Sequence, residues 1–112
     1  TNVNRSKVNI LRNENQLLQK KLDLENTINQ AHNDAKGALK AYSASKKSLE
    51  SRKLSYDYAR EKFELGAMSS FDFTQVKQRF ESAQSDLITS KFDLIFKLKV
   101  LEFYFGIPLS ID

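Results

Sequence analysis

The side chains that proteins use most often for catalysis and metal binding are few and scattered in this sequence. His32 is the only histidine and there is no cysteine, which excludes a histidine cluster or a thiolate site for a metal. The Asp and Glu residues alternate with Lys and Arg, a pattern typical of exposed ion pairs rather than an acid–base pair. No glycine-rich phosphate loop is present. We therefore expect no catalytic residue, no metal and no cofactor, and a protein that is not an enzyme.

The net charge of +4 lies entirely on the first part of the chain. Residues 1–65 carry 13 Lys/Arg and 8 Asp/Glu, whereas residues 66–112 carry 5 and 6. A basic helical nucleic-acid binder would account for this excess, but the basic residues alternate with acidic ones in runs of two at most. The aromatic residues stand at positions typical of helix packing rather than of a base-stacking platform. We expect a solvated helix face and no nucleic-acid partner.

Long helices are the elements that would position these side chains. The 112 residues include three glycines and one proline, which leaves little room for a turn-rich β fold. Charged residues make up 29% of the chain, a fraction that suits amphipathic helices with narrow buried seams. The composition predicts a single all-α domain over residues 1–112.

Residues 3–65 carry the pattern of one long helix. They contain no proline, and Gly37 is their only glycine. Apolar and small residues recur at steps of three and four, which is the heptad pattern of a helix packed along one seam. The seam positions are Ile28, Ala31, Ala35, Ala38, Tyr42, Ser45, Leu49, Arg52, Tyr56, Ala59 and Phe63. Upstream, one stripe continues as Ile10, Leu17 and Leu24, with a second beside it at Leu11, Leu18 and Leu22.

Residues 71–105 predict a second helix with two apolar stripes. Its first seam consists of Phe73, Val76, Phe80, Ala83, Leu87, Ser90, Leu94, Leu98, Leu101 and Phe105. Its second stripe consists of Ile88, Phe92 and Ile95. A helix in an isolated hairpin needs only one apolar stripe, so the second one predicts a further neighbour. Gly106 and Pro108 end the helix, and residues 106–112 are expected to form an extended tail that includes Leu109, Ser110 and Ile111.

A turn at residues 66–70 is expected to join the two helices. Gly66 can adopt the left-handed conformation that closes a helix, and Ser69 with Asp72 three residues later is a short form of the capping box. Met68, Phe71 and Phe73 place large apolar side chains at or beside this turn. Such side chains either fold inward or face a partner.

The two predicted helices differ about twofold in length. About 60 residues extend ~90 Å, whereas about 35 extend ~50 Å. Folding back at Gly66 puts the end of the second helix near residues 28–31 and leaves residues 1–27 without a partner in the chain. The predicted fold is thus a long antiparallel, coiled-coil-like hairpin. The alternative is a three-helix bundle with a break between Asn29 and Gly37, but the seam runs straight through Gly37 and favours an unbroken helix.

The turn and the returning helix together carry a family pattern. The turn supplies Phe63, Gly66, Met68, Ser69, Asp72 and Phe73, and the returning helix supplies Ala83, the run 91–98 and the ending 101–106, Leu-Glu-Phe-Tyr-Phe-Gly. These residues resemble the outer-membrane efflux protein family, the TolC-like exit ducts of Gram-negative bacteria, and the aromatic ending resembles Bacteroidetes-type members. In that family a related motif lies at the periplasmic tip of a helical hairpin. Thr74 and Val76 depart from the family, which more often has Leu and Ala there.

The resemblance implies that the chain is the second α-hairpin of such a duct, removed from its β-barrel. It also implies that the parent protein would contact the outer membrane only through that β-barrel. It implies a homotrimeric parent with this segment in the periplasm. It also implies a periplasmic adaptor protein that docks at the tip and links the duct indirectly to an inner-membrane pump. The adaptor-facing residues would be Gly66, Ala67, Met68, Ser69 and Ser70. Tyr58, Arg60 and Asp72 are candidates for residues that constrict the entrance.

A second interpretation is a cytoplasmic coiled-coil scaffold or protein-interaction module. The heptad seam alone would serve either function. The sequence therefore predicts a non-enzymatic helical hairpin, with an export duct as the first function and a scaffold as the alternative.

Overall fold

The first helix, α1, spans Asn2–Glu64 without interruption in the computed structural model, which describes residues 1–106. The break considered near Gly37 does not occur, so the three-helix alternative is wrong. A side chain added at Gly37 would meet no atom within 4 Å, so this glycine serves neither a bend nor a close contact. The molecule measures 95 Å along its longest axis, as an unbroken helix of 63 residues requires.

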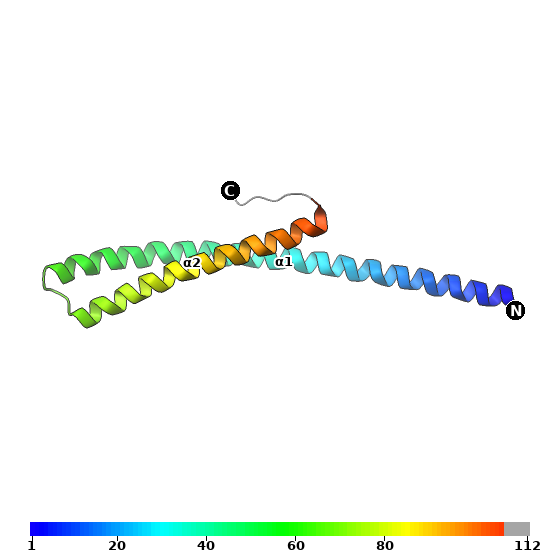
Figure 1. Cartoon of the computed structure of the whole chain (residues 1–112), viewed down its shortest axis with the longest axis horizontal. Coiled ribbons are helices and arrows are strands. Elements are labelled where there is room, and N and C mark those ends of the chain that lie inside the picture. Colours follow the sequence, from blue (N-terminus) through cyan, green and yellow to red (C-terminus); the bar gives the residue numbers. More distant parts are fainter. Residues whose placement is uncertain (107–112) are drawn as a thin grey trace.

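The second helix, α2, spans Ser70–Phe105 and returns along α1, which makes the chain an antiparallel hairpin (Figure 1). The two helices contain 63 and 36 residues, and their bounds lie within one residue of those expected from the pattern. Gly106 closes α2 with φ +67, and its N–H donates to the carbonyl of Glu102. The rest of the expected tail, residues 107–112, lies outside the described residues.

The interface between the helices follows the predicted heptad seams. The buried core residues are Ala31, Ala35, Ala38 and Ala59 of α1 and Ala83, Leu94 and Leu101 of α2, and every one of them is a predicted seam residue. Leu94 is the most deeply buried, with 1% of its surface exposed. Arg52, Phe63 and Phe105 depart from the prediction because they remain exposed despite their seam positions. At Arg52 the reason is the charge, which stays in water because removing it from water is costly.

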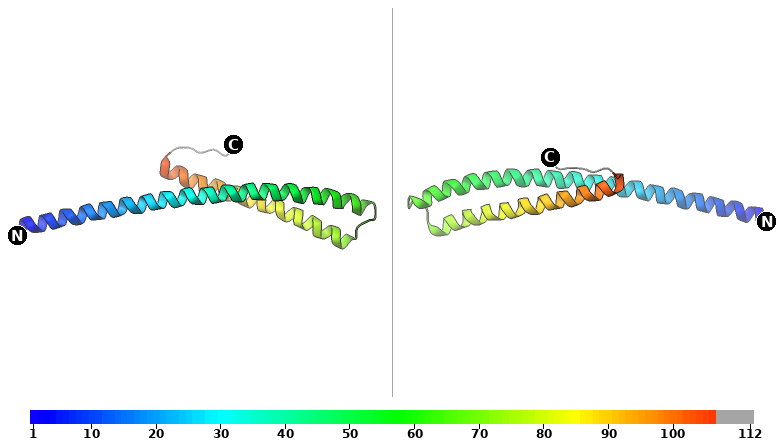
Figure 2. Two further views of the ribbon diagram at one scale, coloured as in Figure 1. Left: turned by 180° about the vertical axis from the view of Figure 1, so that it is seen from behind. Right: turned by 45° about the horizontal axis from the view of Figure 1, so that its top comes forward.

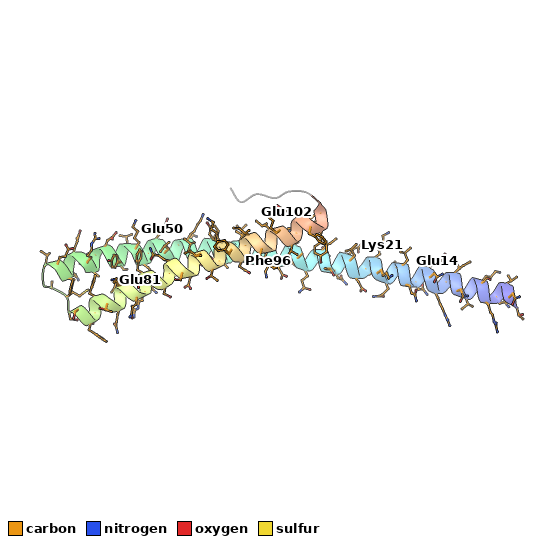
Figure 3. The ribbon with its side chains drawn as sticks, viewed as in Figure 1. Glu14, Lys21, Glu50, Glu81, Phe96 and Glu102 are labelled. Carbon is orange, nitrogen blue, oxygen red and sulfur yellow. The ribbon has the colours of Figure 1, made fainter. Side chains whose placement is uncertain are left out.

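The C-terminal part of α2 packs on α1 close to residues 28–31, as expected from the sequence. Leu101 forms a core cluster with Ala31 and Ala35, and Leu98, Val100 and Tyr104 pack against it. Beyond this level α1 continues alone, as both views in Figure 2 show. Residues 1–27 are all exposed, including the large apolar Val3, Val8, Ile10, Leu11, Leu17, Leu18, Leu22 and Leu24. We call residues 2–27 the α1 extension; Glu14 and Lys21 mark it in Figure 3.

The second apolar stripe of α2 is largely uncovered within the hairpin. Ile88 and Phe92 are 57% and 64% exposed, and Ile95 is half-buried. Phe96 and Phe103 lie exposed on the same helix at 63% and 83%. α1 covers the first seam only, so the neighbour that this stripe predicts is not supplied by residues 1–106.

Candidate functional site

The C-terminus of α1 is closed by a Schellman motif centred on Gly66. Gly66 has φ +77, and its N–H donates to the carbonyl of Phe63 at 3.0 Å. The N–H of Ala67 donates to the carbonyl of Lys62 at 2.8 Å. These two bonds satisfy carbonyls that the helix leaves without partners at its end. The predicted role of Gly66 as the residue that ends the first helix is confirmed.

The N-terminus of α2 is capped by Ser69, also as predicted. Ser69 is extended at φ −73 and ψ 154, and its Oγ accepts a hydrogen bond of 3.1 Å from the backbone N–H of Asp72. Asp72 lies in the first turn of α2, where its negative charge is favourable next to the positive end of the helix dipole. One turn on, the hydroxyl of Thr74 donates to the carbonyl of Ser70 at 2.7 Å. Both helix ends at the turn are therefore held by hydrogen bonds of their own.

The sequence left open whether the apolar side chains at the turn fold inward or face outward, and the structure contains both cases. Phe73 and Met68 are half-buried, whereas Phe71 is 69% exposed. Of the residues predicted to face an adaptor, Gly66, Ala67, Ser69 and Ser70 are exposed. Leu65, just before the glycine, is 84% exposed, and the sequence did not single it out. Its position off the seam beside Gly66 is the signal that could have found it. The turn thus presents Leu65 and Phe71 to solvent.

The three candidates for constricting residues contact different neighbours. Tyr58 is 61% exposed, and the ammonium of Lys62 lies 4.6 Å from the centre of its ring. The guanidinium of Arg60 lies 6.0 Å from the ring centre of Tyr56. Only the backbone N–H of Asp72 takes part in the cap of α2, and the residue itself is exposed. The hairpin brings all three to its turn end, but the recorded contacts do not join them into one cluster.

Four aromatic residues next to the turn form a stack that the sequence analysis did not predict. Ring centres are 4.7 Å apart for Phe63 and Phe73, 5.8 Å for Phe73 and Tyr56, and 5.0 Å for Tyr56 and Phe80. The rings alternate between α1 and α2, so we call these four residues the aromatic zipper. All four were assigned to the seams. Their mutual contact depends on the register between the helices, which a pattern within each helix does not contain.

The remaining polar residues show no arrangement suited to chemistry in the part of the chain that the structure describes. No group of three or more His, Cys, Asp or Glu residues within 1–106 is placed to hold a metal ion. His32 is exposed on α1. The ion pairs Lys97–Asp93 at 3.7 Å and Lys99–Glu102 at 3.1 Å lie within α2, and each has at least one side chain more than half exposed. Such pairs contribute little to stability.

The surface grooves lie along helix faces. One, of about 230 Å³, is lined by α1 and the C-terminal part of α2, including Thr27, Asp34 and Tyr104. Others, of about 330 and 310 Å³, each follow a single helix. No stretch within residues 1–106 is apolar over a length sufficient to cross a bilayer as a helix. Comparison of the chain with protein-family models, with curated proteins and with solved structures found no match.

Proposed function

We propose that this hairpin is a non-enzymatic wall segment of a TolC-like outer-membrane efflux or secretion duct, and that its turn docks a periplasmic adaptor protein. The observation that carries the proposal is the doubly capped turn at one end of a 95 Å rod, which exposes Leu65 and Phe71. The resemblance of residues 63–73 to the tip motif of that family supports the same function.

The turn is suited to docking because its backbone is fixed before a partner arrives. The Schellman motif at Gly66 and the cap at Ser69 hold both helix ends. A preorganised surface loses less conformational entropy on binding than a mobile loop does. Exposed apolar side chains on a rigid scaffold are typical of residues that anchor an interface. Leu65 and Phe71 are therefore the anchors we assign, flanked by the small residues Gly66, Ala67, Ser69 and Ser70.

The helices are suited to a wall because apolar residues lie outside the interface within the hairpin. The second stripe of α2 and the α1 extension expose large aliphatic and aromatic side chains. A ring of helices requires each helix to contact two neighbours, and two stripes on α2 meet that requirement. In the proposed assembly three copies of the parent protein form the duct in the periplasm. Substrate passes through its water-filled interior, and the adaptor links the duct indirectly to an inner-membrane pump.

The docking function is tested by replacing the two anchors, Leu65 and Phe71, with aspartate in the full-length protein. The double variant Leu65→Asp/Phe71→Asp is compared with Gln75→Asp/Gln78→Asp, which adds the same two negative charges at exposed polar positions nearby. Loss of the two apolar anchors is expected to weaken adaptor binding by at least about 30-fold, the factor that corresponds to about 2 kcal/mol for a single anchor. Binding of the purified adaptor by titration and export of a dye from cells are the two measurements. Unchanged binding and export in the double variant would refute the docking role.

The α1 extension gives specific support to a second candidate, a cytoplasmic coiled-coil scaffold. Its stripe Ile10, Leu17 and Leu24 keeps a spacing of seven and is exposed, as in a helix that pairs with another chain. Cell fractionation separates the two candidates, because the duct belongs with the outer membrane and the scaffold with the cytoplasm.

A further inference from the structure

The size of the seam residues changes from one end of the hairpin to the other. Where the C-terminal part of α2 lies on α1, the contacts of α1 are made by Ala31, Ala35 and Ala38, which are 8%, 6% and 6% exposed. Next to the turn α1 contributes the larger aromatic rings of Tyr56 and Phe63, on either side of Ala59, which is 2% exposed. The distance between packed helix axes ranges from about 8 to 10 Å and depends on the side chains at the contact. The two ends of the hairpin therefore favour different helix separations.

The aromatic zipper occupies the seam at the wide end. Phe73 of α2 stacks on Phe63 at 4.7 Å with an angle of 9° between the rings, and lies 5.8 Å from Tyr56. Tyr56 stacks in turn on Phe80 at 5.0 Å and 8°. The third pair, Phe73 and Tyr56, is inclined at 29°. The stacked rings come from alternate helices and lie between them; Phe63 is 39% exposed and the other three are half-buried. Stacked aromatic pairs are each worth about 0.5–1.5 kcal/mol beyond the area they bury. The rings are already in contact, so the helices cannot approach further here without breaking the stack.

The path of the ribbons agrees with this gradient. α1 and α2 lie apart next to the turn in Figure 1 and in both views of Figure 2; farther on their ribbons cross in Figure 1 and in the left view of Figure 2, and they converge in the right view of Figure 2.

We propose that the aromatic zipper is a spacer that sets the distance between the helices at the turn end of the hairpin. It acts against the alanine contacts at the other end, which pull the helices together, and the two together give the hairpin its taper. Leu65 belongs to the end of α1 and Phe71 to the start of α2. The zipper therefore also sets how far apart these two exposed side chains stand.

The spacer is tested by measuring distances between spin labels in the hairpin. Because the chain has no cysteine, labels can be placed at will. One pair, Glu61→Cys and Gln75→Cys, lies beside the zipper, and a reference pair, Lys47→Cys and Thr89→Cys, lies at mid-hairpin. All four positions are exposed. Labelled protein diluted with unlabelled protein gives distances within one molecule by pulsed electron spin resonance.

The two central rings of the zipper, Tyr56 and Phe73, are then replaced by smaller side chains in two variants. The variant Tyr56→Ala/Phe73→Ala is expected to shorten the distance beside the zipper by about 2 Å, the difference between aromatic and alanine-lined packing, with no change at mid-hairpin. The leucine version, Tyr56→Leu/Phe73→Leu, keeps an apolar seam, and about 1 Å of shortening is expected. It provides the test if the alanine variant loses helical circular dichroism.

The matched control is Phe71→Ala, which removes an aromatic ring at the turn that lies outside the zipper and is 69% exposed. It is expected to leave both distances unchanged. An unchanged distance beside the zipper in the folded leucine variant would overturn the proposal, as would equal shortening in Phe71→Ala. The readout lies within the hairpin and requires no adaptor, so the spacer can fail while the docking function holds, and the reverse.

Discussion

Replacing Gly66 by alanine tests the conformation on which the turn depends. Gly66 has φ +77, a left-handed conformation that costs a residue with a Cβ roughly 1–2 kcal/mol. The added Cβ would meet no atom within 4 Å, so no clash adds to this cost. Alanine also restricts the unfolded chain, which offsets about 0.4–1 kcal/mol. We expect Gly66→Ala to lower the free energy of unfolding by about 1 kcal/mol.

The matched control is the same substitution at Gly37. This glycine lies inside α1, and a Cβ there also meets no atom within 4 Å. Alanine is favoured over glycine by about 1 kcal/mol inside a helix, so Gly37→Ala is expected to stabilise the hairpin. Replacing glycine by alanine should therefore destabilise the hairpin at position 66 and stabilise it at position 37. The difference arises from backbone conformation alone.

Urea unfolding followed by circular dichroism at 222 nm measures both variants. A slope of about 1–2 kcal/mol per molar urea converts 1 kcal/mol into a midpoint shift of about 0.5–1 M, downward for Gly66→Ala and upward for Gly37→Ala. Titrations at two protein concentrations show whether association contributes. A midpoint for Gly66→Ala at or above that of the unaltered chain would refute the left-handed cap.

Two further predictions concern the seam and the second cap. Leu94→Ala removes the side chain with 1% exposure and is expected to destabilise the hairpin by about 2–5 kcal/mol. Ile88→Ala, at a position with 57% exposure, should change stability by well under 1 kcal/mol. Equal effects of the two substitutions in urea unfolding would contradict the assignment of the two stripes. Ser69→Ala removes the oxygen that accepts from the N–H of Asp72 and should cost about 1 kcal/mol. Ser70→Ala is its control, since Ser70 accepts from Thr74 through its backbone carbonyl, and a loss as large as that of Ser69→Ala would contradict the cap.

The caps and the seams could be predicted from the sequence because local chemistry decides them. Only glycine adopts φ +77 without strain, and a serine three residues before an aspartate supplies a cap within one turn. The seams follow from a spacing that repeats over many turns, so single exceptions did not obscure it. Arg52 shows the limit of this reasoning. A repeat identifies the face on which a residue lies, but whether the side chain is buried depends on its charge and its reach.

The arrangement around the turn could not be predicted in the same way because it depends on the register between the helices. The stack of Phe73 between Phe63 and Tyr56 requires a particular alignment of two segments that are distant in sequence. The outward position of Leu65 likewise follows from where the cap at Gly66 ends α1. The heptad pattern contains neither alignment, although it assigned Phe63, Phe73 and Tyr56 to the seams.

The exposed apolar residues indicate what the hairpin still lacks. Leu17 and Leu24 of the α1 extension precede Ala31 at intervals of seven residues, so they lie on the line along α1 that α2 covers farther on. A helix that covered the extension would therefore follow the line that α2 begins. The exposed stripe of α2 is a separate surface, because α1 already occupies the other side of that helix. A single neighbour along one line cannot cover both surfaces, so burial of both requires contacts with at least two further segments.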